Sequence, residues 1–139
     1  MTYEEKGKWV YLTVSTLAFV TYVGIILSKA QNMALAEVSY ASTLLWVLGI
    51  SITVTILSQI AIAIAKPGEA DRKDIRDKEI NRFGDNVGGI VLGVAMIVPF
   101  LFALNGVSHF WIANTMYAAF LLSAVVSSIV KIVAYRRGL

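Results

Sequence analysis

Carboxylates are the side chains in this sequence most able to do chemistry, and four of them recur at helical intervals. Asp71, Asp74, Asp77 and Asp85 fall within a third of the circumference of a helix built on residues 71–87. Oxygen ligands of this kind bind divalent cations. Residues three apart on a rigid helix rarely converge on one ion, however, so a solvated acidic face is the preferred interpretation. We therefore predict no catalytic residue, no metal site and no cofactor.

The remaining residue types also argue against an enzyme. The sequence has no cysteine and a single histidine, His109. Without cysteine there are no disulfides, thiolate metal sites or thiol relays, and one histidine is too few for a histidine-based metal cluster or a haem pair. No dinucleotide fingerprint, P-loop or zincin motif is present.

A second set of polar side chains lies inside apolar runs, and Gln59 and Asn114 stand out among them. Their structural interpretation is hydrogen bonding between helices, and their functional interpretation is a polar path for an ion or water. The same runs contain no Asp, Glu or Arg, whereas proton-coupled exporters bury an ionisable residue at mid-membrane. A proton-coupled exporter is therefore disfavoured.

The elements that must position these residues are predicted to be four membrane-spanning helices. Hydrophobic residues make up 58% of the 139 residues and charged residues 15%, against roughly 45–50% and 25% in soluble domains. A helix needs about 20 apolar residues to cross a bilayer. We expect an all-α fold, a four-helix transmembrane bundle in one domain (1–139), with spans at 9–28, 41–65, 87–104 and 110–133.

The distribution of positive charge predicts the orientation of these spans. Eleven of the twelve Lys and Arg residues lie near the two termini or between the second and third spans, and only Lys29 lies on the opposite side. Short cytoplasmic segments are enriched in Lys and Arg. We therefore expect a multi-pass plasma-membrane protein with both termini in the cytoplasm.

A charged cytoplasmic helix is predicted over residues 69–86, directly before the third span. Counted from Lys66, the six basic residues of this connection are balanced by six acidic residues, which argues against a polybasic lipid-binding patch or a nucleic-acid surface. Opposite the acidic face lies an apolar face with one arginine, which needs a partner: the other cytoplasmic ends of this chain, or another protein. If the partner is another protein, the predicted binding residues are Asp74, Arg76, Asp77, Ile80 and Phe83.

The order Asp74-x-Arg76-Asp77-x-x-Ile80-x-x-x-Gly84, followed directly by an apolar helix, carries a resemblance. It resembles the signature of a domain-of-unknown-function family of small prokaryotic integral membrane proteins. The likeness covers about eleven residues together with the general layout. It implies a bacterial or archaeal inner membrane and brings no established reaction.

Small residues and a proline mark the third span. Gly84, Gly88, Gly89 and Gly93 form two offset pairs at four-residue spacing, which let helices approach closely, within one chain or between two copies. Pro99 removes a backbone donor and should bend this helix near Ala95.

These observations favour a membrane protein that is not an enzyme and acts by binding a protein partner through its charged helix. Two alternatives remain. One is a small channel or transporter, as a single copy or a homo-oligomer, with a path lined by Gln59 and Asn114. The other is a metal-dependent enzyme acting on lipid at the cytoplasmic surface. The expected surroundings are the lipid bilayer, and no nucleic acid is expected to bind.

Overall fold

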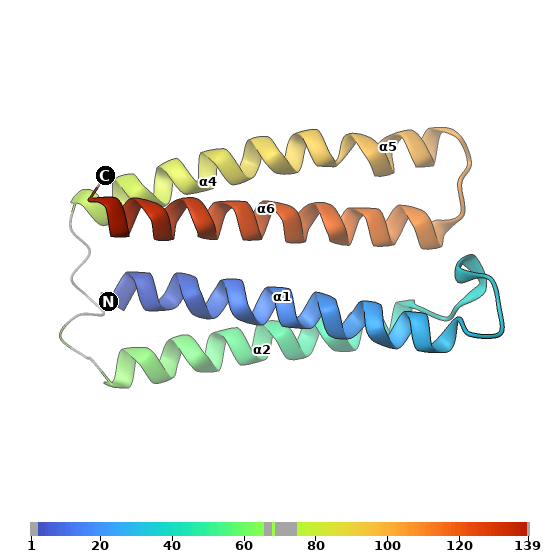
Figure 1. Ribbon diagram of the computed structural model, residues 1–139, viewed down its shortest axis with the longest axis horizontal. Helices are drawn as coiled ribbons and strands as arrows, with labels where there is room; N and C mark the ends of the chain where they lie inside the picture. Colours follow the sequence, from blue (N-terminus) through green and yellow to red (C-terminus); the bar gives the residue numbers. More distant parts are fainter. Residues whose placement is uncertain (1–2, 66–67, 69–74, 139) are drawn as a thin grey trace.

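The computed structural model describes residues 3–65, 68 and 75–138, and its regular structure there is entirely helical. Asp74 and the first residues of the predicted charged helix lie outside the described residues. The elements are α1 (Tyr3–Lys29), the short 3-10 helix η1 (Leu35–Glu37), α2 (Ala41–Ala65), α4 (Ile75–Ala95), α5 (Ile97–Leu104) and α6 (His109–Arg137) (Figure 1).

Four helical units in the described part of the chain are long and apolar enough to cross a membrane. They are α1, α2, α4 together with α5, and α6. The prediction of four such helices is confirmed, and α2 has the predicted bounds. A helix suits an apolar solvent because it satisfies its backbone hydrogen bonds internally.

The third unit is broken where the proline predicts. Pro99 has no N–H to donate to the carbonyl of Ala95, so the helix ends there and α5 begins at Ile97. Met96, between the two, still donates its N–H to the Leu92 carbonyl at 2.9 Å. The helix is thus interrupted next to Ala95, where the bend is predicted.

The helices run antiparallel to their sequence neighbours, and their contacts follow a row. The main packed pairs are α2 with α1, α1 with α6, and α6 with α4 and α5. In Figure 1 the helices accordingly appear in the order α4, α6, α1, α2. Both termini lie at one end of the molecule, which we call the terminal end, and η1 lies at the opposite end.

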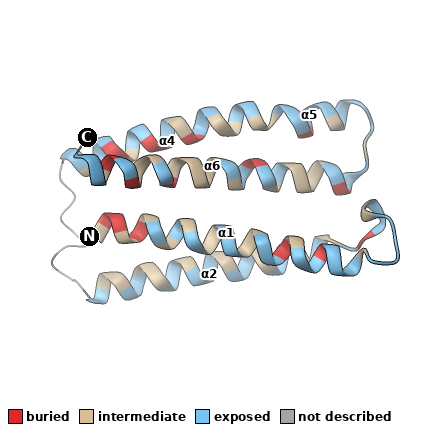
Figure 2. Ribbon diagram, in the orientation of Figure 1, coloured by how far each residue is buried: buried red, intermediate tan, exposed pale blue. Residues whose placement is uncertain are grey.

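Most residues of the helices are exposed or intermediate, and few are buried, as Figure 2 shows. None of the residues of α2 is buried, and Leu45 and Trp46 are 70% and 72% exposed. A soluble protein rarely leaves apolar surface of this extent in water. The helical packing is therefore that of a bundle whose outer faces suit a hydrocarbon solvent.

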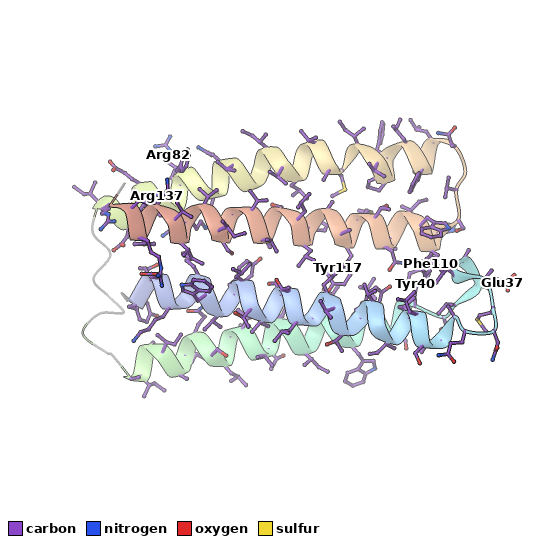
Figure 3. All side chains as sticks on the ribbon, viewed as in Figure 1. Glu37, Tyr40, Arg82, Phe110, Tyr117 and Arg137 are labelled. Atoms are coloured by element: carbon purple, nitrogen blue, oxygen red, sulfur yellow. The ribbon has the colours of Figure 1, made fainter. Side chains whose placement is uncertain are left out.

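The buried apolar core lies toward the end opposite the termini. Tyr22, Ile26, Val38 and Phe110 form its centre, with Tyr117 packed against them. Aromatic rings meet edge to face here: the Tyr40 and Phe110 rings lie 5.3 Å apart, between centroids. Figure 3 shows Tyr40 and Phe110 toward that end and Tyr117 nearer the middle of the bundle. Aromatic packing thus joins α1, α6 and the segment before α2 at the opposite end.

Candidate functional site

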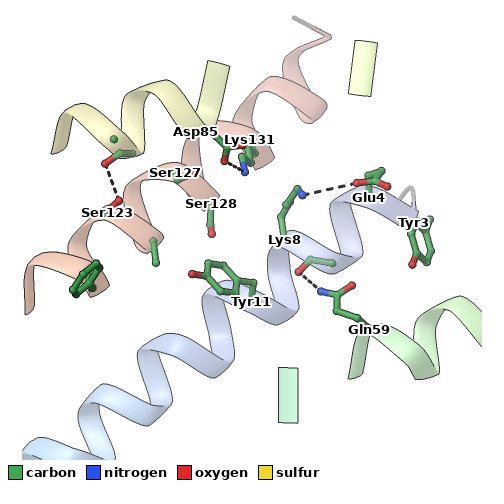
Figure 4. A pocket seen from close by; sticks show the side chains of 15 residues that line it. Tyr3, Glu4, Lys8, Tyr11, Gln59, Asp85, Ser123, Ser127, Ser128 and Lys131 are labelled. Carbon is green, nitrogen blue, oxygen red and sulfur yellow. Dashed lines mark hydrogen bonds and ion pairs between the residues drawn. The ribbon is translucent and has the colours of Figure 1, made fainter. Parts of the chain in front are cut away.

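A polar cavity of about 670 Å³ opens between the helices toward the terminal end (Figure 4). Residues of α1, α2, α4 and α6 line it, and most of its polar side chains are hydroxyls or charged groups. Its size is within the roughly 300–1,000 Å³ of ligand sites. The polar cavity is lined by, among others, Tyr3, Glu4, Lys8, Tyr11, Gln59, Asp85, Ser123, Ser127, Ser128 and Lys131.

Gln59 joins the wall of the cavity that α1 and α2 form. Its amide nitrogen donates to the backbone carbonyl of Gly7 at 3.1 Å. Gly7 permits this approach, because a Cβ there would lie 2.9 Å from the Gln59 Oε1 atom. The sequence singled out Gln59 as a polar residue inside a span, and the structure makes it both an interhelical tie and a cavity residue.

Close backbone approach of α4 to α6 forms the opposite wall. Ser123 Oγ donates to the Gly88 carbonyl at 2.7 Å. A Cβ on Gly88 would lie 2.9 Å from the Ser127 Cβ, so only glycine fits this contact. Gly84, one turn earlier, lies closer still to the side chain of Lys131. Gly84 and Gly88 are therefore points of close packing between α4 and α6 within one chain.

The second glycine pair is placed differently. Neither Gly89 nor Gly93 has a heavy atom within 4 Å of the position a Cβ would take, so neither is a point of close packing in this chain. Gly89 borders the polar cavity, whereas Gly93 is not among the residues that line it. A Cβ added at either residue thus meets open space.

Charges around the cavity are balanced. Lys131 Nζ lies 2.6 Å from Asp85 Oδ1, and Lys8 Nζ lies 3.8 Å from Glu4 Oε2. Glu4 is buried, and its pairing with a residue four positions away keeps the charge compensated. Two carboxylates and two ammonium groups therefore face the cavity together with several hydroxyl groups, a lining suited to a polar ligand that carries both signs of charge or none.

A further ion pair joins α1 to α6 at the terminal end. Arg136 Nε lies 2.9 Å from Glu5 Oε1, and Glu5 is only 6% exposed. The Arg136 guanidinium also lies over the Trp9 ring, 5.8 Å from its centroid. These contacts fix the spacing of the two central helices where the cavity opens.

The predicted partner-binding residues lie mostly against α6 of the same chain. Arg76 donates to the Tyr135 carbonyl at 3.1 Å, and the Tyr135 hydroxyl donates to Asp77 at 2.7 Å. Ile80 is buried, with 4% exposure, whereas Phe83 is 58% exposed. Arg76, Asp77 and Ile80 therefore bind the chain's own terminal end, which was one of the two partners considered from the sequence. Ile80 is not part of an exposed docking surface.

Asn114 lies away from the polar cavity. Its side-chain oxygen accepts a hydrogen bond from the Tyr22 hydroxyl, and its nitrogen donates to the Phe110 carbonyl at 2.7 Å. It belongs to the packing of the opposite end, and the structure does not bring it together with Gln59.

Sequence reasoning missed the charged residues of the cavity because it assigned their charges to orientation alone. Ser123, Ser127 and Lys131 recur at four-residue intervals, so they share one face of α6. Glu4 and Lys8 have the same spacing on α1. These two stripes are the signal that could have indicated a polar site between the first and last helices.

No family model matches the chain, and no curated protein or solved structure matches it either. The resemblance carried by residues 74–84 stays a prediction. Function must accordingly be argued from the geometry of the site.

Proposed function

We propose that this chain is a non-enzymatic, multi-pass protein of a prokaryotic inner membrane that binds a small polar molecule in the polar cavity, as a small transporter. The observation that carries the proposal is the cavity itself, which four helices build from charged and hydroxyl side chains. Charged and hydroxyl side chains that converge on one cavity provide the few polar groups by which a ligand site orients a polar molecule.

The positive charges support a cytoplasmic opening for the cavity. Eleven of the twelve Lys and Arg residues lie near the two termini or, in the sequence, between α2 and α4. By the positive-inside rule the terminal end of the bundle faces the cytoplasm. Ligand would then enter from the cytoplasm.

Closure of the opposite end supports a transporter rather than an open channel. Tyr22 and Phe110 are buried together there with Tyr117 packed against them, and the lining of the polar cavity reaches only to Tyr11 and Phe120. A cavity open at one end and closed at the other is the arrangement expected of an inward-open state in alternating access.

A matched pair of glycine variants tests ligand binding in the cavity. Gly89→Leu places a side chain at the border of the polar cavity, and Gly93→Leu places the same side chain one turn further along α4, where it does not line the cavity. Ligand bound to the folded state raises stability, by about 2.7 kcal/mol at a hundredfold excess over Kd.

The assay is a thermal-shift screen of the purified protein against amino acids, quaternary amines, organic phosphates and sugars. We expect at least one class to stabilise the wild type and Gly93→Leu, and to lose its effect on Gly89→Leu. If no class stabilises the wild type more than Gly89→Leu, the proposal is wrong.

A second candidate function is docking of another protein on the end of α4, and the exposure of Ile75 and Phe83 favours it. These side chains are 76% and 58% exposed on the charged part of the helix. Cross-linking in native membranes would compare Phe83→Ala with Phe100→Ala, an exposed phenylalanine in α5. Loss of one defined cross-linked partner in the first variant alone would support docking, and an unchanged pattern would refute it.

A further inference from the structure

A second cavity, of about 560 Å³, continues from the polar cavity toward the opposite end. It lies between α1, α2 and α6, and its lining is mainly aliphatic and aromatic, including Leu48, Ile52, Met116 and Leu121. We call it the apolar cavity. Tyr11, Phe120 and Ala124 line both cavities, so the two form one continuous groove.

The groove is polar at the terminal end and apolar toward the opposite end. On α6 the polar cavity extends from Lys131 to Phe120 and the apolar cavity from Ala124 to Ala113. At 1.5 Å per residue each part is roughly 16 Å long, and the whole groove roughly 27 Å. The charged part lies at the terminal end, where lipid head groups would lie, and the apolar part extends into the hydrocarbon.

The groove therefore repeats the order of a phospholipid along its length: a polar group at the terminal end, then an apolar chain. Its head-group end carries two acidic and two basic side chains, which match a head group that carries one charge of each sign. Lys131 pairs with Asp85 and Lys8 with Glu4. A head group with one phosphate and one ammonium group can exchange partners with such pairs without leaving a charge uncompensated.

Tyr117 lies between the two ends of the apolar cavity on α6, Ala124 and Ala113. Its ring lies 5.2 Å from that of Phe19 and 5.4 Å from that of Tyr22. These contacts join the apolar cavity to the aromatic packing of the opposite end.

We infer that the molecule bound at the proposed site is a zwitterionic phospholipid, with its head group in the polar cavity and one acyl chain in the apolar cavity. This inference rests on the proposed function, since it names the chemical class of the ligand. The apolar cavity is the added observation, because a purely polar solute would leave it unused.

The test uses lysophosphatidylethanolamine and its head group, phosphoethanolamine, as probes for purified full-length protein in maltoside micelles. Ala113→Phe fills the apolar cavity from α6, and Ser51→Phe fills it independently from α2, in case the first variant does not fold. Ala118→Phe adds the same ring to an exposed position of α6 that lines neither cavity and serves as the control. Equilibrium binding of the radiolabelled probes gives Kd for each variant.

We expect lysophosphatidylethanolamine to bind the wild type and Ala118→Phe saturably, at least tenfold more tightly than phosphoethanolamine, and to bind both cavity-filling variants at least tenfold more weakly. Phosphoethanolamine should bind all of these proteins alike. Equal affinity of the two probes, or lysophospholipid binding that neither filling variant weakens, would overturn the inference. The proposed function would survive either result if Gly89→Leu still removed ligand binding. If neither probe bound the wild type, the inference would be overturned, and the thermal-shift screen would then decide the proposed function.

Discussion

A Cβ added at Gly88 tests whether the close approach of α4 to α6 belongs to a single chain. Gly88→Ala places that atom 2.9 Å from the Ser127 Cβ and 3.3 Å from Ser123 Oγ. The nearest neighbours are the stem of one side chain and the hydroxyl that binds the Gly88 carbonyl at 2.7 Å. Overpacking of this kind costs about 1–3 kcal/mol, and loss of the hydrogen bond adds about 0.6 kcal/mol.

Gly93→Ala is the matched control, because its added methyl group meets no heavy atom within 4 Å. It also replaces glycine by a better helix former, which is worth about 1 kcal/mol in an exposed helix. Reversible unfolding in mixed micelles, followed by circular dichroism at a monomeric protein concentration, gives the free energy of unfolding. We expect Gly88→Ala to be less stable than wild type and Gly93→Ala to be equal or more stable. Equal effects, or a cost for Gly88→Ala that depends on protein concentration, would refute packing within one chain.

Two further substitutions test the contacts around the cavity. Arg136→Gln removes the 2.9 Å ion pair with the buried Glu5 carboxylate and should lower the free energy of unfolding by about 1–2 kcal/mol. Arg137→Gln, at the neighbouring exposed arginine, is the control and should lower it little. Equal losses in chemical denaturation would show that only net charge matters. Gln59→Leu keeps the side-chain volume but removes the donor to the Gly7 carbonyl, so unfolding should show a small loss of about 0.6 kcal/mol, and a gain in stability would contradict the interhelical bond.

The spans were predictable because an apolar solvent imposes a length and a composition on each helix. The bounds of α2 agree with its uncharged run, and Pro99 indicated the break before α5 from its missing N–H alone. The close packing at Gly88 was also visible as a spacing of small residues, although the spacing does not say which helix lies opposite.

The site was less predictable because it depends on which helices become neighbours. Lys8 and Lys131 lie at opposite ends of the sequence, and only the pairing of α1 with α6 brings them to one cavity. A helical projection likewise places Arg76 and Ile80 on one face without showing that α6 covers that face. Local periodicity gives the face of a helix, and tertiary packing decides what the face contacts.

The central claim, that the polar cavity is wet and opens to the cytoplasm, can be measured directly because the chain has no cysteine of its own. Ser127→Cys places one thiol in the cavity, and Ile129→Cys places one two residues away on α6, at an exposed position that lines neither cavity. The thiolate that reacts forms only where water is present. The measurement is the labelling rate of each variant by a membrane-impermeant methanethiosulfonate in inside-out and right-side-out vesicles.

We predict that Ser127→Cys is labelled in inside-out vesicles only, and much faster than Ile129→Cys in the same vesicles. Labelling of Ser127→Cys that is no faster than that of Ile129→Cys, or that occurs in right-side-out vesicles, would contradict a water-filled cavity open to the cytoplasm.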